Sequence, residues 1–408
     1  MAVIVPPSPN SSTKTPFSIS KLISKLKLRR SSKTHQQLQN HIPHDARPPL
    51  IPSPLPFVLP EHQQTLSQLG WTTLTFPPHN PSLFPEAPGP HPLQAAYEDL
   101  FLAAQAFFDL DDEEKTEWKH KLGSEEGWSK IPGEKEFITL RTLSYTPDIL
   151  KAPAKRYWDL MGAHISSTLG RISTSLGMDH DSSLGLGRFV GPCKTMGVGE
   201  EEKTSTMLRI FRYESWTPKV VAEAHADLGL LSCVVGDVPG LEVWNGCQFV
   251  DIERLYEREG KTGAKATMLV GRQLERFSNG RYPAGGHRVV SYGHEIPTLD
   301  HHAVTASAGG EHELGNSGGR KYRHSLVFVL RAHEPVPVNS VELETEITGK
   351  WMEPIKDVTA GELYEQIRSQ YFNINIGHEE REKQRRRVRE RKMKEAGKPN
   401  GNSAEATR

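Results

Sequence analysis

The sequence predicts a mainly β protein with helices, in which a sandwich or barrel follows a helical amino-terminal part. After about residue 205, short apolar runs bounded by Gly, Pro, Asn or Asp follow one another closely, which is typical of a β-sandwich or barrel. Before that point the apolar residues recur at helical spacing. The composition, 36% apolar and 25% charged, is that of an ordinary globular protein.

The expected strands and helices follow from these patterns. The strands are Met207–Tyr213, Gly229–Val235, Gly240–Trp244, Ala266–Gly271, Gly286–Tyr292 and Arg323–Leu330. A first helix is expected over Leu93–Phe108, and a second, ending near Gly177, is expected to follow Pro153 because proline is disfavoured inside a helix. Thr359 and Glu362 have the spacing of a capping box, so a further helix should pack outside the β region.

The charge is distributed unevenly along the chain. Residues 1–44 carry seven Lys or Arg and no acidic residue, and residues 378–408 carry eleven Lys or Arg against six acidic residues. Since the net charge is +0, the rest of the chain carries 0 − 7 − 5 = −12. An acidic body binds nucleic acid poorly. No stretch approaches the roughly 20 apolar residues of a membrane helix, so we expect neither nucleic-acid nor membrane partners.

The ends of the chain and its cysteines bear on localisation. We expect residues 1–48 to form a disordered basic leader and residues 378–408 a disordered basic tail that starts as a solvated helix. Three cysteines are too few for a disulfide framework, which favours a reducing compartment and a cytoplasmic protein. The basic, Ser-rich leader also has the composition of a mitochondrial transit peptide, although prolines interrupt its first residues; mitochondria are therefore the alternative.

A candidate metal site comprises His225, Asp227 and His287. Residues i and i+2 of a strand point to the same side, so His225 and Asp227 can bind one ion. A histidine from a neighbouring strand would complete a set of two histidines and one carboxylate, which suits non-haem Fe(II) because it leaves positions open for O2 and a co-substrate. With 18 His and 50 acidic residues, His-x-Asp/Glu pairs arise by chance; the strand-rich surroundings distinguish this one.

Those surroundings carry a family resemblance. Within Gly271–Val290, Asn279-Gly280, Tyr282 and His287-Arg288-Val289 stand in the order typical of the plant and fungal iron/2-oxoglutarate dioxygenases, the isopenicillin N synthase-like family. Other blocks that resemble the family, in the right order, are Leu208–Tyr213, His225–Ser232, Pro239–Trp244 and Tyr322–Ser325.

The resemblance implies a fold. We expect a double-stranded β-helix, or jelly roll, over 205–335, preceded by a helical or mixed domain over 49–204. A carboxy-terminal helical segment over 336–377 should follow, and the long spacing between His287 and Arg323 makes 293–321 an inserted loop.

The resemblance also implies a reaction and site residues. His225, Asp227 and His287 would bind Fe(II), and Arg323, Ser325 and Tyr213 would bind 2-oxoglutarate as co-substrate. The Arg323 guanidinium would pair with a carboxylate through two parallel hydrogen bonds. The expected enzyme is a dioxygenase that hydroxylates, desaturates or cyclises a small organic molecule, such as a secondary metabolite, and releases succinate and CO2. O2 is the second co-substrate, ascorbate is a candidate reductant, and we expect a monomer.

Two substitutions depart from the family pattern and keep alternatives open. Phe211 stands where the family usually has Asn, and Arg272 where it usually has Asp. The alternatives are an iron oxidase that uses no 2-oxoglutarate and a catalytically inactive jelly-roll binding module. The sequence does not identify residues that bind the substrate.

Overall fold

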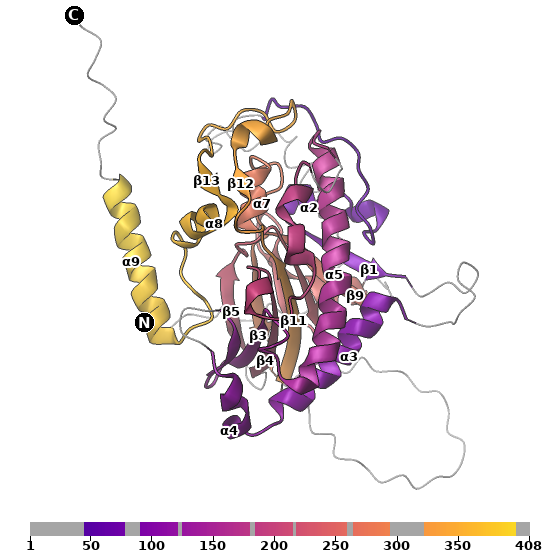
Figure 1. Ribbon diagram of the computed structural model, residues 1–408, viewed down its shortest axis with the longest axis vertical. Helices are drawn as coiled ribbons and strands as arrows, with labels where there is room; N and C mark the ends of the chain where they lie inside the picture. Colours follow the sequence, from indigo (N-terminus) through magenta and orange to yellow (C-terminus); the bar gives the residue numbers. More distant parts are fainter. Residues whose placement is uncertain are drawn as a thin grey trace, which may run out of the picture.

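The computed structural model describes residues 45–77, 90–120, 125–179, 184–214, 218–258, 264–293 and 322–396 (Figure 1). Most of the predicted leader 1–48, nearly all of the predicted loop 293–321 and the end of the predicted tail 378–408 lie outside these residues. Within the described ranges, no helix has the length and apolar character needed to span a membrane.

The larger of two sheets that form the centre of the molecule has seven strands in the described part of the chain. They are antiparallel and run in the order β1-β9-β6-β11-β4-β3-β2. Their bounds are β1 (Trp71–Phe76), β2 (Gly127–Ile131), β3 (Lys135–Leu140), β4 (Met207–Glu214), β6 (Leu231–Gly236), β9 (Ala264–Val270) and β11 (Tyr322–Leu330). The first three of these strands come from before residue 205, so the amino-terminal part extends the sheet.

The smaller sheet has the order β5-β10-β7-β8 among the described residues. Its strands are β5 (Lys219–His225), β7 (Leu241–Trp244), β8 (Phe249–Asp251) and β10 (His287–Ser291). An apolar core lies between the two sheets, with Phe211 and Val234 from the larger sheet and Val221, Leu241 and Val289 from the smaller one. Two antiparallel sheets that close over a shared core form the jelly roll that the sequence predicted.

Helices α3 (Pro92–Phe108) and α5 (Asp148–Ser175) run along the other face of the larger sheet (Figure 1). Successive side chains of a strand point to opposite faces of the sheet, so the face toward the helices carries a second apolar core, which includes Leu208 and Phe328. In this core Trp158 of α5 packs edge-on against Phe328, with ring centroids 5.4 Å apart. The helices therefore fix the outer face of the sheet, while the inner face is left to line the interior of the jelly roll.

The predicted start of the second helix was wrong. Helix α5 begins at Asp148, five residues before Pro153, and ends close to Gly177 as expected. Proline at this position deletes one intrahelical hydrogen bond, to the carbonyl of residue 149. Ile149 is exposed, so water can satisfy that carbonyl.

The carboxy-terminal part ends in two helices. Thr359 forms the predicted capping box of α8 (Ala360–Arg368): its hydroxyl accepts from the Glu362 amide at 3.2 Å, and the Glu362 carboxylate accepts from the Thr359 amide at 2.7 Å. Helix α9 (His378–Ala396) stands beside the body of the molecule (Figure 1). Shorter elements are α2 (Thr65–Leu69), α4 (Asp112–Lys115), α6 (Ile252–Arg258), α7 (Arg272–Phe277), β12 (Pro337–Val338), β13 (Val358–Thr359) and six 3-10 turns in the described residues.

Candidate metal centre

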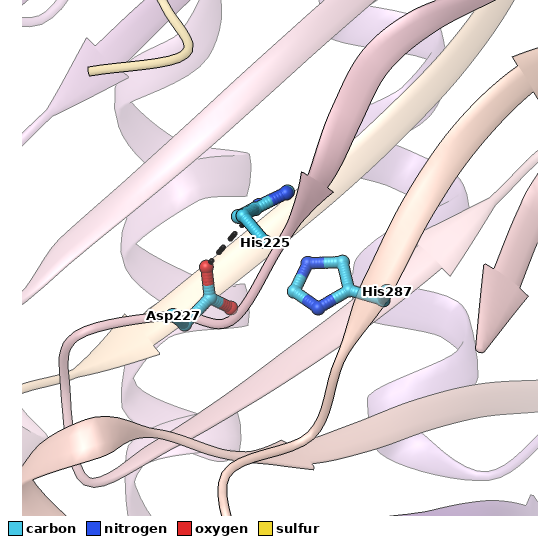
Figure 2. A group of neighbouring side chains, drawn as sticks. All are labelled: His225, Asp227 and His287. Atoms are coloured by element: carbon cyan, nitrogen blue, oxygen red, sulfur yellow. Dashed lines mark ion pairs between the residues drawn. The ribbon is translucent and has the colours of Figure 1, made fainter. Parts of the chain in front are cut away.

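Two histidines and an aspartate meet at the end of two neighbouring strands of the smaller sheet. His225 is the last residue of β5 and His287 the first of β10, and antiparallel pairing places them opposite each other. Asp227 follows in the loop beyond β5. One ligand atom from each side chain lies within 4.8 Å of the other two (Figure 2). The structure thus brings together the three residues that the sequence predicted as iron ligands.

Backbone contacts fix both imidazole rings. The Nδ1 atom of His225 lies 2.6 Å from the Glu223 carbonyl oxygen, and that of His287 lies 3.0 Å from the Gly285 carbonyl oxygen. A carbonyl oxygen only accepts, so each Nδ1 carries the proton and donates it. The lone pair is then on Nε2 of each ring, the atom that a metal would bind.

The protonation states also suit a metal. Burial, together with the nearby His287 ring, lowers the pKa of the His225 imidazole to about 3, which keeps it neutral. Burial disfavours the Asp227 carboxylate, but His287 and His225 outweigh burial and lower its pKa. One Asp227 oxygen is buried and has no hydrogen-bond partner in the described chain. A divalent cation would satisfy that oxygen, so the residues present fit a metal ion.

The three predicted co-substrate residues lie on adjacent strands of the larger sheet, on its inner face. Tyr213 of β4 pairs in register with Arg323 of β11, and the guanidinium lies 5.8 Å from the Tyr213 ring centroid. Tyr213 and Ser325 line a cavity of about 60 Å³ together with the three candidate metal ligands. Burial raises the pKa of Tyr213 to about 12, so its hydroxyl remains protonated.

Arg323 lies in a space that two glycines leave open. A Cβ at Gly236 would come within 2.4 Å of its Nη2, and one at Gly240 within 2.7 Å of its Nε. The Nη1 atom of Arg323 and the Ser325 hydroxyl are buried without a hydrogen-bond partner among the described residues. These polar groups could receive a carboxylate, since such groups are rarely left unpaired in a folded protein.

Comparison with known proteins supports the fold. No family model matches this chain, and no curated protein matches its sequence. Three solved structures match with a TM-score of 0.50: a full-length Neurospora crassa protein in complex with alpha-KG and 5-formyluracil, a 2OG-Fe(II) oxygenase family protein from Caulobacter crescentus, and JOX2 in complex with 2OG, Fe and JA. Their identities are 19%, 18% and 16%; they cover 74%, 76% and 75% of this chain and 86%, 93% and 78% of their own.

The chain has the 2OG-Fe(II) oxygenase fold. At these identities the likeness establishes the fold alone, and it agrees with the jelly roll that the motif order predicted.

Arg323 has a partner that the sequence did not predict. Its Nη2 lies 3.3 Å from a carboxylate oxygen of Glu253 on α6, and its Nε donates to the Val238 carbonyl at 2.9 Å. Glu253 also accepts from the backbone amides of Gly240 and Leu241. No motif marked Glu253, because the short helix α6 was not expected. One edge of the guanidinium is therefore already bound by the protein.

The two departures from the family pattern have separate structural consequences. Phe211 lines the small cavity and stacks on Tyr213 with ring centroids 5.1 Å apart, so an apolar ring stands where the family has an amide. The backbone amide of Arg272 donates to the Asp227 carbonyl at 2.8 Å, while its side chain pairs with Glu275. Because the contact to Asp227 uses the backbone, the change from Asp to Arg leaves it intact.

A second cavity, of about 640 Å³, opens beside two of the three candidate metal ligands. It is lined by His225 and Asp227 and by aromatic and arginine side chains that the sequence did not single out, among them Trp244, Phe249 and Arg209. The segment 371–375, which follows α8, forms part of its wall. Residues that are distant in sequence build this cavity, so no local pattern could have revealed it.

Proposed function

We propose that this protein is an Fe(II)- and 2-oxoglutarate-dependent oxygenase that oxidises a small organic molecule. The observation that carries the proposal is the triad of His225, Asp227 and His287, which offers two Nε2 lone pairs and an unpartnered carboxylate oxygen to one ion. The fold supports the proposal, because the Neurospora crassa protein and JOX2, which share it, were crystallised with alpha-KG or 2OG.

The bound iron would supply the reaction with O2: 2-oxoglutarate, O2 and a substrate C–H bond give succinate, CO2 and a hydroxylated product, with one oxygen atom in succinate and one in the product. The protein's own contribution is to hold the reactants. Arg323 and Ser325 would bind the distal carboxylate of 2-oxoglutarate through atoms that lack partners in the described chain. Tyr213 would donate a hydrogen bond from its hydroxyl to the same co-substrate. The apolar side chains of Phe211 and Val234 would exclude water from the small cavity.

The resemblance suggests a secondary metabolite as the substrate, and hydroxylation, desaturation and cyclisation are all open to the same site. One observation favours the alternative of an oxidase that uses no 2-oxoglutarate. The Glu253 carboxylate already neutralises Arg323, which weakens the attraction of the guanidinium for a second carboxylate.

The test is an anaerobic titration of the metal-free protein with Fe(II) and 2-oxoglutarate, followed by the visible absorption band of the iron chelate. We expect a band in the wild type, none in Asp227→Ala because iron is not held, and a band only at much higher 2-oxoglutarate in Arg323→Ala. Bound iron without a band at any 2-oxoglutarate concentration would support the oxidase. Failure to bind iron would support the other alternative, a catalytically inactive jelly-roll binding module.

A further inference from the structure

Arg209 is a cation at the junction of the two cavities. It lies on the inner face of β4 between Met207 and Phe211, and it lines both the small cavity and the large one. Its Nε donates to the Thr139 hydroxyl at 2.8 Å, and its guanidinium lies 5.5 Å from the Phe137 ring centroid. These contacts hold the stem of the side chain and use one of its five N–H groups.

Arg209 differs from the other arginines of the large cavity because it has no ion-pair partner among the described residues. The others, with their carboxylates, are Arg331 with Glu125, Arg368 with Glu365 and Arg272 with Glu275. The remaining acidic group of the wall is Asp227, which the metal would use. With iron bound, Arg209 is therefore the one guanidinium of the wall that forms no ion pair within the described chain, and Glu125 attracts it only at longer range.

Part of the wall is suited to an apolar molecule. Its aromatic members are Trp244, Phe249, Tyr364, Tyr371 and Phe372. A volume of about 640 Å³ lies within the range of pockets that enclose small organic ligands. An apolar body with a single negative group would match this wall, because a buried unpaired charge is costly and a charge-assisted hydrogen bond removes that cost.

We propose that the substrate is a monoanionic organic acid, whose carboxylate pairs with Arg209 while its apolar body lies against the aromatic wall near the metal. This inference rests on the proposed function, since it assigns the large cavity to the substrate and the small one to 2-oxoglutarate. A single unpaired guanidinium matches one carboxylate better than a phosphate dianion, which would need a second free cation.

The experiment measures acid binding in the intact, iron-loaded protein under anaerobic conditions with saturating 2-oxoglutarate. The probes are two acids, decanoate and 4-phenylbutyrate, and their neutral amides, decanamide and 4-phenylbutyramide. Quenching of tryptophan fluorescence reports binding, because Trp244 lines the cavity. The iron–2-oxoglutarate band, recorded on the same samples, reports the metal centre independently.

We expect the acids to bind at least about tenfold more tightly than the amides, as hydrogen bonds to a charged group allow. Arg209→Gln should abolish this preference, and Arg209→Lys should retain part of it. Both variants should keep the iron–2-oxoglutarate band, which also shows that they fold. The matched control is Arg156→Gln, an arginine outside both cavities with its own carboxylate partner Asp99, which should keep the preference within about threefold.

Three results would overturn the inference: amides that bind as tightly as acids, an acid preference that survives in Arg209→Gln, or a band that is lost in Arg209→Gln alone. The last result would assign Arg209 to the co-substrate. A wild type without the band would overturn the proposed function instead, and fluorescence would still decide whether Arg209 selects acids.

Discussion

One oxygen of the buried Asp227 carboxylate has no hydrogen-bond partner in the described chain, while the neighbouring histidines lower the pKa of the group and favour its charged form. The fixed imidazoles of His225 and His287 lie beside it and are already in the tautomer that a metal requires. The triad is therefore in the charge state and orientation that a metal requires before a metal binds.

We predict that Asp227→Asn lowers stability both without and with metal. The neutral amide should lower the stability of the metal-free protein, because a carboxyl whose pKa is lowered by folding stabilises the fold in its charged form. It should also abolish the stabilisation that saturating Fe(II) gives the wild type, because a charged ligand is lost. Anaerobic thermal unfolding with and without Fe(II) measures both effects. Asp99→Asn, at an exposed ion pair with Arg156, serves as the control.

A rise in metal-free stability on Asp227→Asn, or an undiminished shift of Tm with Fe(II), would contradict this account of the triad.

His164 should make stability depend on pH. It lies in α5, stacked on Phe57 with ring centroids 5.0 Å apart, and burial lowers its pKa to about 4 from the usual 6.5. The folded protein keeps this ring neutral, while the unfolded chain takes up a proton near pH 6.5. The stability that depends on neutral His164 is therefore complete above about pH 6.5 and is lost as the pH falls toward 4.

Urea unfolding at pH 7.5, 6 and 5 tests this expectation. In His164→Leu the free energy of unfolding should fall less between pH 7.5 and 5 than in the wild type, whereas the exposed His378→Gln should match the wild type. Equal pH dependence in wild type and His164→Leu would exclude His164 as the source. His225, whose pKa is also lowered, would supply part of any remaining dependence.

Helix α9 anchors the wall of the large cavity. Arg381, which is 4% exposed, holds Glu134 through two hydrogen bonds and donates to the Ile374 carbonyl. From β3, the buried Lys135 amine donates to the same carbonyl at 3.3 Å and to the Asn375 side chain at 3.1 Å. Ile374 and Asn375 line both cavities, so the position of α9 sets the shape of the site.

We therefore predict that Arg381→Ala loosens the segment 371–377. Breaking a buried ion pair leaves Glu134 without its partner and releases the Ile374 carbonyl. Hydrogen exchange followed by mass spectrometry should show at least about tenfold faster exchange across 371–377. Arg386→Ala, on the exposed side of the same helix, should leave exchange there unchanged. Equal protection in Arg381→Ala and the wild type would show that α9 does not hold this wall.

The elements that the sequence predicted well carry local signals. The alternating apolar runs gave β4, β6, β7, β9, β10 and β11 to within a few residues, and the Thr359 capping box marked the start of α8. Strand β5 and helix α6 carry mixed or short patterns and were not predicted as elements. Glu253 lies on α6, so the partner of Arg323 was missed with it.

At the scale of the molecule, the jelly roll could be predicted because its motif blocks occur in order along the chain. The participation of β1–β3 in the larger sheet could not, because β1 pairs with β9 and β3 with β4 across long stretches of sequence. The large cavity could not be predicted for the same reason, because elements distant in sequence form it: β4, the end of β5, α8 and the segment 371–375. Contacts between distant elements, rather than local pattern, determine where the substrate would bind.

The most direct test of the proposed reaction is the ratio of succinate formed to O2 consumed when the iron-loaded protein is mixed with air and 2-oxoglutarate, with the carboxylic acids of the binding panel as substrates. We predict one succinate for each O2, with turnover lost in Asp227→Ala and, at 2-oxoglutarate concentrations that saturate the wild type, also in Arg323→Ala. Consumption of O2 without succinate would contradict the assignment of Arg323 and Ser325 to 2-oxoglutarate, and no consumption of O2 by the iron-bound protein would contradict the oxygenase itself.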